Sequence, residues 1–231
     1  MHYKIIILSI LVLLSNHLAL AQQKVDTALK NQLDELMIKD QQYRKFMRYK
    51  DAQKDSLARQ FGVPVDSLSK HLYSLQNSLD SSNWAVIETI FYKQGYPGKT
   101  LVGEPSDEVA WYILQHNLRK IRQYFPLIEE AGKKGELPYS LVAKMQDRLL
   151  VMNNEKQIYG TQTTGLKILN PKTGKKEFQW FIWPIKDPKN VNKRRKEAGF
   201  DDSIEENAKR LGAKYTEITL EQINKIRADN H

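Results

Sequence analysis

Apolar residues recur every three or four positions along most of this chain, which is the spacing of amphipathic helices. A first stripe predicts a helix over residues 25–60 that is broken by the Gly-Val-Pro at 62–64. A second stripe predicts a helix over residues 68–90, with Asp66 as its N-cap and a stop at Gly95.

The centre of the chain carries its most apolar helical pattern. A helix is predicted to begin at Ser106, and its apolar residues between 109 and 121 cover most of the circumference, which is typical of a buried helix. Pro126 is expected to interrupt or restart this helix, and Gly135 to end the next piece. Residues 141–152 show a further amphipathic pattern.

After residue 156 the pattern becomes strand-like. Residues 157–162, 166–169 and 178–185 are short β-prone runs, and the Asn-Pro-Lys-Thr-Gly at 170–174 is a turn sequence. We therefore predict a mainly α fold with a small β-hairpin or sheet insert around residues 157–185.

The first residues have the pattern of a signal peptide. Lys4 supplies a positive start, residues 5–14 are almost entirely apolar, and Ala19-Leu20-Ala21 has the small residues of a cleavage site. The apolar run is shorter than the ~20 residues of a membrane helix, so an uncleaved anchor is the less favoured alternative. We expect cleavage near Ala21, a periplasmic or secreted protein without a membrane span, and a single compact helical domain over residues 22–231.

Composition excludes several kinds of site. The chain has no cysteine, which excludes disulfides, zinc–thiolate sites, iron–sulfur clusters and cysteine nucleophiles. Beyond residue 21 the histidines are His71, His116 and His231, whose spacing does not form a histidine metal site. The chain has no nucleophile-elbow motif, phosphate-binding loop or dinucleotide fingerprint. We expect no metal site and no cofactor, although a purely carboxylate site for magnesium or calcium stays open.

The formal net charge of +9 is concentrated in one stretch. Residues 165–196 hold 10 basic and 2 acidic residues, which gives +8. A basic stretch can bind nucleic acid, but such runs are more often solvated surface, and the expected export argues against that partner. We expect no nucleic-acid partner, and the sequence names no protein partner.

Several polar residues interrupt the apolar stripes. Asp40 lies on the stripe of the first helix, and Arg44 follows one turn later, so the two can pair. Gln115 and His116 lie on the most apolar helix. Because a buried polar group needs partners, each belongs either to a structural network or to a binding site.

Asp147 and Arg148 lie on a predicted helix, and Asp147 is opposite the centre of its apolar stripe. The pattern predicts a surface position and an ordinary solvated ion pair.

A set of motifs occurs in a distinctive order along the chain. They are Asp40-Gln41-x-x-Arg44, Asp80-x-x-Asn83, Gly95-Tyr96-Pro97, Gln115-His116, Asp147-Arg148, Gln157-Ile158-Tyr159-Gly160-Thr161-Gln162, Pro184-Ile185-x-Asp187 and Arg194-Arg195. On these motifs, over about residues 33–200, the chain resembles the bacterial domain-of-unknown-function family 6624 with its QHAD…DR…QxYGTQ…RR pattern. Tyr96 stands where the family has tryptophan. Asn117-Leu118 replaces Ala-Asp, so a carboxylate beside His116 is missing.

The resemblance names no reaction, but it implies that the polar motif residues share a pocket. The predicted ligand-binding residues are Gln115, Gln157, Tyr159, Gln162, Arg195, Asp40 and Arg44, and the predicted catalytic residues are His116, Asp147 and Arg148. Trp111 and Tyr159 are candidate stacking walls.

Three functions stay open at this point. The first is a pocket that binds a small polar or anionic ligand through its arginines. The second is a metal-independent hydrolase or lyase, with His116 as general acid or base, Asp147 as its partner and Arg148 stabilising negative charge. The third is a structural or interaction module of the cell envelope, which predicts no pocket around His116 and an exposed apolar patch elsewhere.

Overall fold

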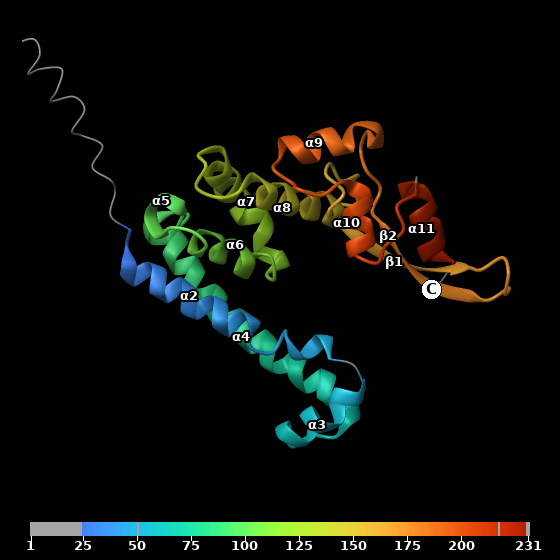
Figure 1. Ribbon diagram of the computed structural model, residues 1–231, viewed down its shortest axis with the longest axis horizontal. Coiled ribbons are helices and arrows are strands. Elements are labelled where there is room, and N and C mark those ends of the chain that lie inside the picture. Colours follow the sequence, from blue (N-terminus) through green and yellow to red (C-terminus); the bar gives the residue numbers. More distant parts are fainter. Residues whose placement is uncertain (1–24, 50, 217, 230–231) are drawn as a thin grey trace, which may run out of the picture.

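The computed structural model describes residues 25–49, 51–216 and 218–229. The predicted signal peptide, with its cleavage site near Ala21, lies outside the described residues. The predicted fold class is confirmed, because helices dominate and the sheet is a two-stranded antiparallel hairpin. Figure 1 shows an elongated molecule with a body of helices at one side and the hairpin projecting from the other.

The helical body contains the larger hydrophobic core. Its elements are α2 (Thr27–Gln41), α4 (Val65–Gln94), α5 (Lys99–Val102), α6 (Val109–Leu114), α7 (Leu118–Lys133) and α8 (Tyr139–Met152). α6 lies at the centre, as its all-round apolar sequence predicts, and it packs against α2, α4 and α7. Leu33, Ile87, Leu114 and Ile121 are fully buried there, and they come from four different helices.

The prediction of one helix over residues 25–60 is wrong, because the structure has two separate helices there. α2 is followed by a turn and then by a separate helix, α3 (Asp51–Phe61). In the turn, the rings of Tyr43 and Phe46 lie edge-on to the ring of Phe61. These contacts hold α3 back against α4, which a continuous helix would not allow.

Other predictions about helix ends are also corrected. Asp66 lies in the first turn of α4 rather than at its N-cap, which is Pro64, and its charge there still suits the helix dipole. Pro126 does not interrupt α7, because it lies exposed, where water can replace the missing backbone hydrogen bond. The helix predicted from Ser106 is a 3-10 turn followed by α6, and it breaks again at residues 115–117.

The hairpin forms where the sequence predicts it. β1 (Thr163–Leu169) pairs with β2 (Lys176–Ile182), and the predicted turn at residues 170–174 joins them. The prediction of a strand over residues 157–162 is wrong. This segment is a loop whose one bridge joins Gln157 to Ile185, because its backbone groups are bonded mainly by side chains.

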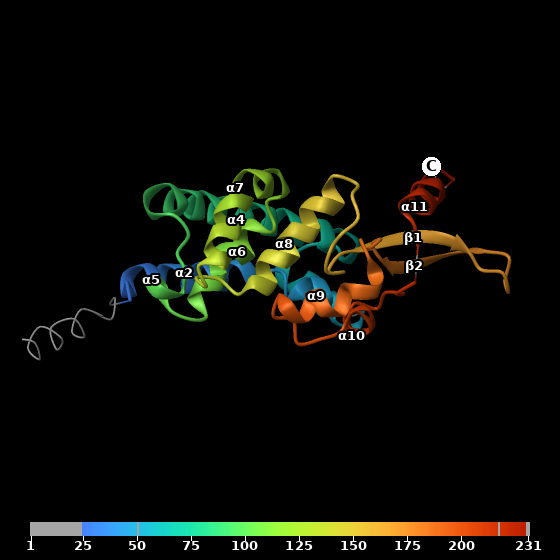
Figure 2. The same cartoon turned by 90° about the horizontal axis from the view of Figure 1, so that it is seen from above.

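Short helices surround the base of the hairpin. They are α9 (Val191–Glu197), α10 (Ile204–Arg210) and α11 (Leu220–Ala228). Figure 2 shows α11 beside one side of the hairpin. Ile223 of α11 packs there with Leu166, Phe181 and Trp183. None of the helices in the described part of the chain has the length and apolarity that a membrane crossing requires.

Candidate functional site

A cavity of about 180 Å³ lies where α6, α8 and α10 meet the loop of residues 157–162. We call it the α8–α10 cavity. Its lining residues are Trp111, Gln115, Lys144, Arg148, Thr161, Gln162, Phe200, Asn207, Arg210 and Leu211. Gln115, Arg148 and Gln162 were predicted as pocket residues and Trp111 as a stacking wall. The lining has three cationic side chains and no carboxylate.

Two of these cations are half-buried and lack an acidic partner. Arg148 donates from Nη1 to the carbonyl of Gln115 at 2.7 Å, and neither Arg148 nor Lys144 forms an ion pair within the described residues. The Lys144 ammonium lies 5.9 Å from the centre of the Phe200 ring. Burial lowers the pKa of both groups. For Lys144 the nearby charge of Arg210 adds to the effect, while the more distant carboxylates of Glu108 and Asp202 oppose it. Half-buried cations without a carboxylate in contact favour an anion beside them.

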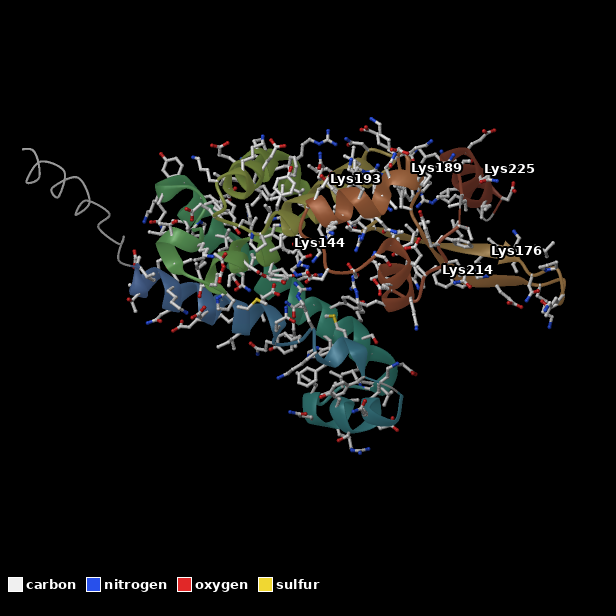
Figure 3. The ribbon with its side chains drawn as sticks, turned by 45° about the horizontal axis from the view of Figure 1, so that its top comes forward. Lys144, Lys176, Lys189, Lys193, Lys214 and Lys225 are labelled. Carbon is white, nitrogen blue, oxygen red and sulfur yellow. The ribbon has the colours of Figure 1, made fainter. Side chains whose placement is uncertain are left out.

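Arg210 completes the cationic lining of this cavity. It comes from α10, bonds to the side-chain oxygen of Asn207, and lies 3.4 Å from Asp202. Lys144 lies where the helical body faces α10 (Figure 3). The indole nitrogen of Trp111 is buried without an acceptor in the described residues. The walls therefore offer donors and positive charge.

Asp147 is not the surface residue that its position on the helix predicts, because it is 0 % exposed. Its carboxylate accepts hydrogen bonds from the backbone N–H groups of Ile158, Tyr159 and Thr161 and from the Thr161 hydroxyl, at 2.7–3.2 Å. Burial raises the pKa of Asp147, and these hydrogen bonds oppose the rise. Asp147 and Arg148 are therefore not a solvated pair: Asp147 holds the loop, while Arg148 lines the cavity.

Gln157 also acts within the loop. Its amide nitrogen donates to the carbonyls of Gln162 and Trp183, and its amide oxygen accepts from the Gln162 N–H at 2.8 Å. Its side chain is fully buried, so it does not line the α8–α10 cavity. The ring of Tyr159 lies beside Phe200, at 6.1 Å between centres, just outside the lining.

Arg195 is 1 % exposed and holds the same loop from the other side. Its guanidinium donates to the carbonyls of Tyr159 and Asp202, forms an ion pair with the Asp202 carboxylate, and lies over the Phe200 ring. Asn207 donates to the carbonyl of Gly160. Because these bonds occupy the guanidinium, Arg195 supports the loop and does not line the α8–α10 cavity.

Gly160 explains why the loop turns so tightly at this point. Its φ of +75° lies in the left-handed region, and a side chain there would collide with Ile204 and Ile185. The loop therefore presents Thr161 and Gln162 to the cavity in a fixed position.

The other predicted residues form a separate cluster between α2 and α4, which we call the Asp40 cluster. Asp40 is 1 % exposed and pairs with Arg44, as predicted from their spacing, at 3.3 Å. Arg44 also contacts Asp80 at 2.5 Å, and Gln76 donates to Asp80 and to the Asp40 carbonyl. The cluster thus satisfies most of its own charges.

His116 lies at the edge of the Asp40 cluster, with Nε2 at 3.7 Å from Asp40 Oδ2. It lines a different cavity, of about 500 Å³, together with Asp80, Asn117 and other residues. Burial and Arg44 lower the pKa of His116, while Asp40 and Asp80 oppose the change. In the described residues His116 shares no hydrogen bond with Asp147, so the structure does not form the predicted dyad.

Sequence reasoning missed six cavity residues, namely Lys144, Thr161, Phe200, Asn207, Arg210 and Leu211. One signal was available, because Lys144 lies one helical turn before Arg148 and shares its face. Thr161 lies in the loop motif itself. Phe200, Asn207, Arg210 and Leu211 follow the loop by about forty residues or more, and only the fold brings them to it.

Comparisons with family models, with curated proteins and with solved structures found no match to this chain. In the described residues, no three histidine, aspartate or glutamate side chains converge to hold a metal ion.

Proposed function

We propose that this protein binds a small anionic ligand, a carboxylate or a phosphate, in the α8–α10 cavity. The observation that carries the proposal is the pair of half-buried cations, Lys144 and Arg148, with no carboxylate in contact. Burying an unpaired charge costs free energy, and a bound anion removes that cost. The signal-peptide pattern supports encounter of this ligand outside the cytoplasm.

The neutral donors of the cavity suit the same ligand. The amides of Gln115, Gln162 and Asn207 line it together with the cations, whereas the one proton of the Thr161 hydroxyl is donated to Asp147. Anions bind best where charge-assisted hydrogen bonds are supplemented by neutral donors in fixed positions. The loop that carries Gln162 is held by Asp147 and Arg195, so this donor is positioned before a ligand arrives.

The size of the cavity restricts the ligand. About 180 Å³ admits a small molecule such as a phosphate or a short organic acid, and it is below the usual range for drug-sized ligands. The aromatic rings of Trp111 and Phe200 add apolar wall beside the cations.

The test is a titration with inorganic phosphate, sulfate, acetate and citrate, followed by calorimetry at low ionic strength, with chloride as reference. We expect at least one anion to bind. We expect Arg148→Gln and Lys144→Gln each to weaken that binding about 10- to 100-fold, the value of one charge-assisted hydrogen bond. The matched control is Arg119→Gln, an arginine of the His116 cavity, which should leave binding unchanged. Absence of binding by all four anions, or equal weakening by the control, would contradict the proposal.

Catalysis by His116 stays a prediction. Its nearest carboxylate is that of Asp40, which is already bonded to Arg44 and Gln41. No observation favours it over ligand binding.

A further inference from the structure

The two faces of the hairpin differ in character. Residues that pair across the strands share a face, so Trp180, Phe178 and Lys176 lie opposite Gly165, Lys167 and Leu169 respectively. The alternate residues, such as Leu166 and Phe181, form the other face, which packs against α11. One face of the hairpin is therefore part of the core, and the other is open.

The open face is apolar over much of its length. Leu169 is 63 % exposed, Phe178 is 58 % exposed and Trp180 is 45 % exposed. The Phe178 and Trp180 rings meet edge to face at 5.2 Å, and the Phe178 ring lies directly over Gly165, where any side chain would collide with it. The result is a preformed aromatic ridge exposed to water. A contiguous exposed apolar patch of this kind often marks an interaction site.

Positive charge surrounds this ridge. The hairpin carries Lys167, Lys172, Lys175 and Lys176 against one acidic residue, Glu177, which points to the α11 face. Figure 3 shows that the lysines continue from the hairpin to α9, through Lys176, Lys189 and Lys193. The lysines of residues 165–196 are all exposed, although Lys176 donates to the backbone carbonyl of Asp229 at 2.9 Å. The two arginines of this stretch are more deeply engaged in internal bonds. The net charge of +8 on residues 165–196 therefore lies mostly on the surface.

We propose that the open face of the hairpin docks on a bilayer surface that contains anionic phospholipid. Phe178, Trp180 and Leu169 would enter the headgroup region, where aromatic side chains are favoured, and the lysines would contact the lipid phosphates. The hairpin projects beyond the helical body, so its tip and open face can reach a flat surface (Figures 1 and 2). This interaction is independent of ligand binding in the α8–α10 cavity.

A nucleic acid is the other polyanion that combines aromatic and basic side chains. Single strands bind by stacking bases on open ring faces. Here the Phe178 ring covers Gly165 and meets Trp180 edge to face, and Leu169 offers no ring. These features favour a lipid surface over a single-stranded nucleic acid as the partner. The test therefore includes an oligonucleotide for comparison.

The chain contains its own reporter for this docking. Trp84, Trp111 and Trp183 are at most 6 % exposed, whereas Trp180 is 45 % exposed. Adding vesicles of equal parts phosphatidylglycerol and phosphatidylcholine to the full chain should shift tryptophan emission to the blue, and added salt should reverse the shift. Trp180→Phe keeps the apolar surface and should abolish the shift while vesicle co-sedimentation persists. Because the apolar segment at residues 5–14 can itself enter lipid, the local signal from Trp180 is decisive.

Two variants and a control complete the experiment. Phe178→Ser combined with Leu169→Ser should remove the emission shift of Trp180, and Lys172→Gln combined with Lys175→Gln should weaken the binding that this shift reports about 30-fold. Tyr92→Ser removes an aromatic side chain that is 92 % exposed on α4, and it should change nothing. An unchanged Trp180 emission with anionic vesicles would overturn the proposal. So would an equal shift with neutral phosphatidylcholine vesicles, or a shift with a single-stranded oligonucleotide but not with vesicles.

Discussion

The Asp40 cluster and the α8–α10 cavity are both polar regions to which the helical body contributes side chains, and they differ in how their charges are paired. In the Asp40 cluster, Arg44 lies between two carboxylates, and each carboxylate has several donors. In the cavity, Lys144 and Arg148 have no carboxylate in contact. A polar residue on an apolar stripe is thus not by itself a sign of a binding site. The more informative sign is a buried charge that the protein leaves uncompensated.

The largest expected effect is on the stability of the protein, and it comes from removing a charge of the Asp40 cluster. Asp40→Asn removes one of the two carboxylates that pair with Arg44 and leaves Gln41 and Arg44 facing a neutral amide, and losing hydrogen bonds to a charged group costs about 1.5–3 kcal/mol. Thermal unfolding should show a fall in Tm on the order of 10 °C. The matched control is Asp34→Asn on the same helix, where the ion pair with Lys30 is half-exposed and should be worth less than about 1 kcal/mol. Equal effects of the two substitutions would show that the Asp40 cluster does not depend on its charge.

A smaller effect, of opposite sign, is expected in the cavity. Lys144→Met removes a half-buried charge that has no carboxylate in contact, so the free energy of unfolding without ligand should rise by about 1 kcal/mol. Calorimetry should record an increase in Tm of roughly 2–4 °C. Lys193→Met, on the exposed surface of α9, serves as control and should leave Tm nearly unchanged. A lower Tm for Lys144→Met would mean that the protein already compensates this charge.

The smallest expected effect is on the pH dependence of stability, and it comes from His116 at the edge of the Asp40 cluster. The pKa of His116 in the folded protein lies below its usual value of 6.5, mainly because of burial and the charge of Arg44. Below pH 6.5 the unfolded chain therefore binds this proton more readily than the folded chain, and stability falls as the pH decreases through that value. His116→Gln should flatten this part of the profile of Tm against pH. An unchanged slope in the variant would exclude His116 as its source, and His71→Gln is the control for a histidine with no place in the cluster.

Most of the fold was predictable because its signals are local. The apolar periodicity predicts α4 and α8, and the turn sequence at 170–174 predicts the hairpin. The errors occur where tertiary contacts override the local pattern. The contacts of Tyr43 and Phe46 with Phe61 separate α3 from α2, and the side chains of Asp147 and Gln157 replace strand pairing in the loop of residues 157–162.

The candidate site was only partly predictable. The motifs contain Gln115, Arg148 and Gln162, which do line one cavity. Sequence cannot distinguish a residue that faces a cavity from one that supports it, since both are polar and interrupt an apolar pattern. Asp147 and Arg148 are adjacent, yet the Asp147 carboxylate accepts hydrogen bonds from backbone N–H groups of the loop, whereas Arg148 lines the cavity.

The sequence by itself determined the kinds of element, the absence of cysteine chemistry, and the concentration of positive charge in residues 165–196. These properties depend on composition and on neighbours within a few positions along the chain. Only the tertiary structure decided which charges are paired, because pairing depends on contacts between distant segments, such as Arg44 with Asp80 and Arg195 with Tyr159. It also decided that one face of the hairpin is covered by α11 while the aromatic ridge on the other stays exposed.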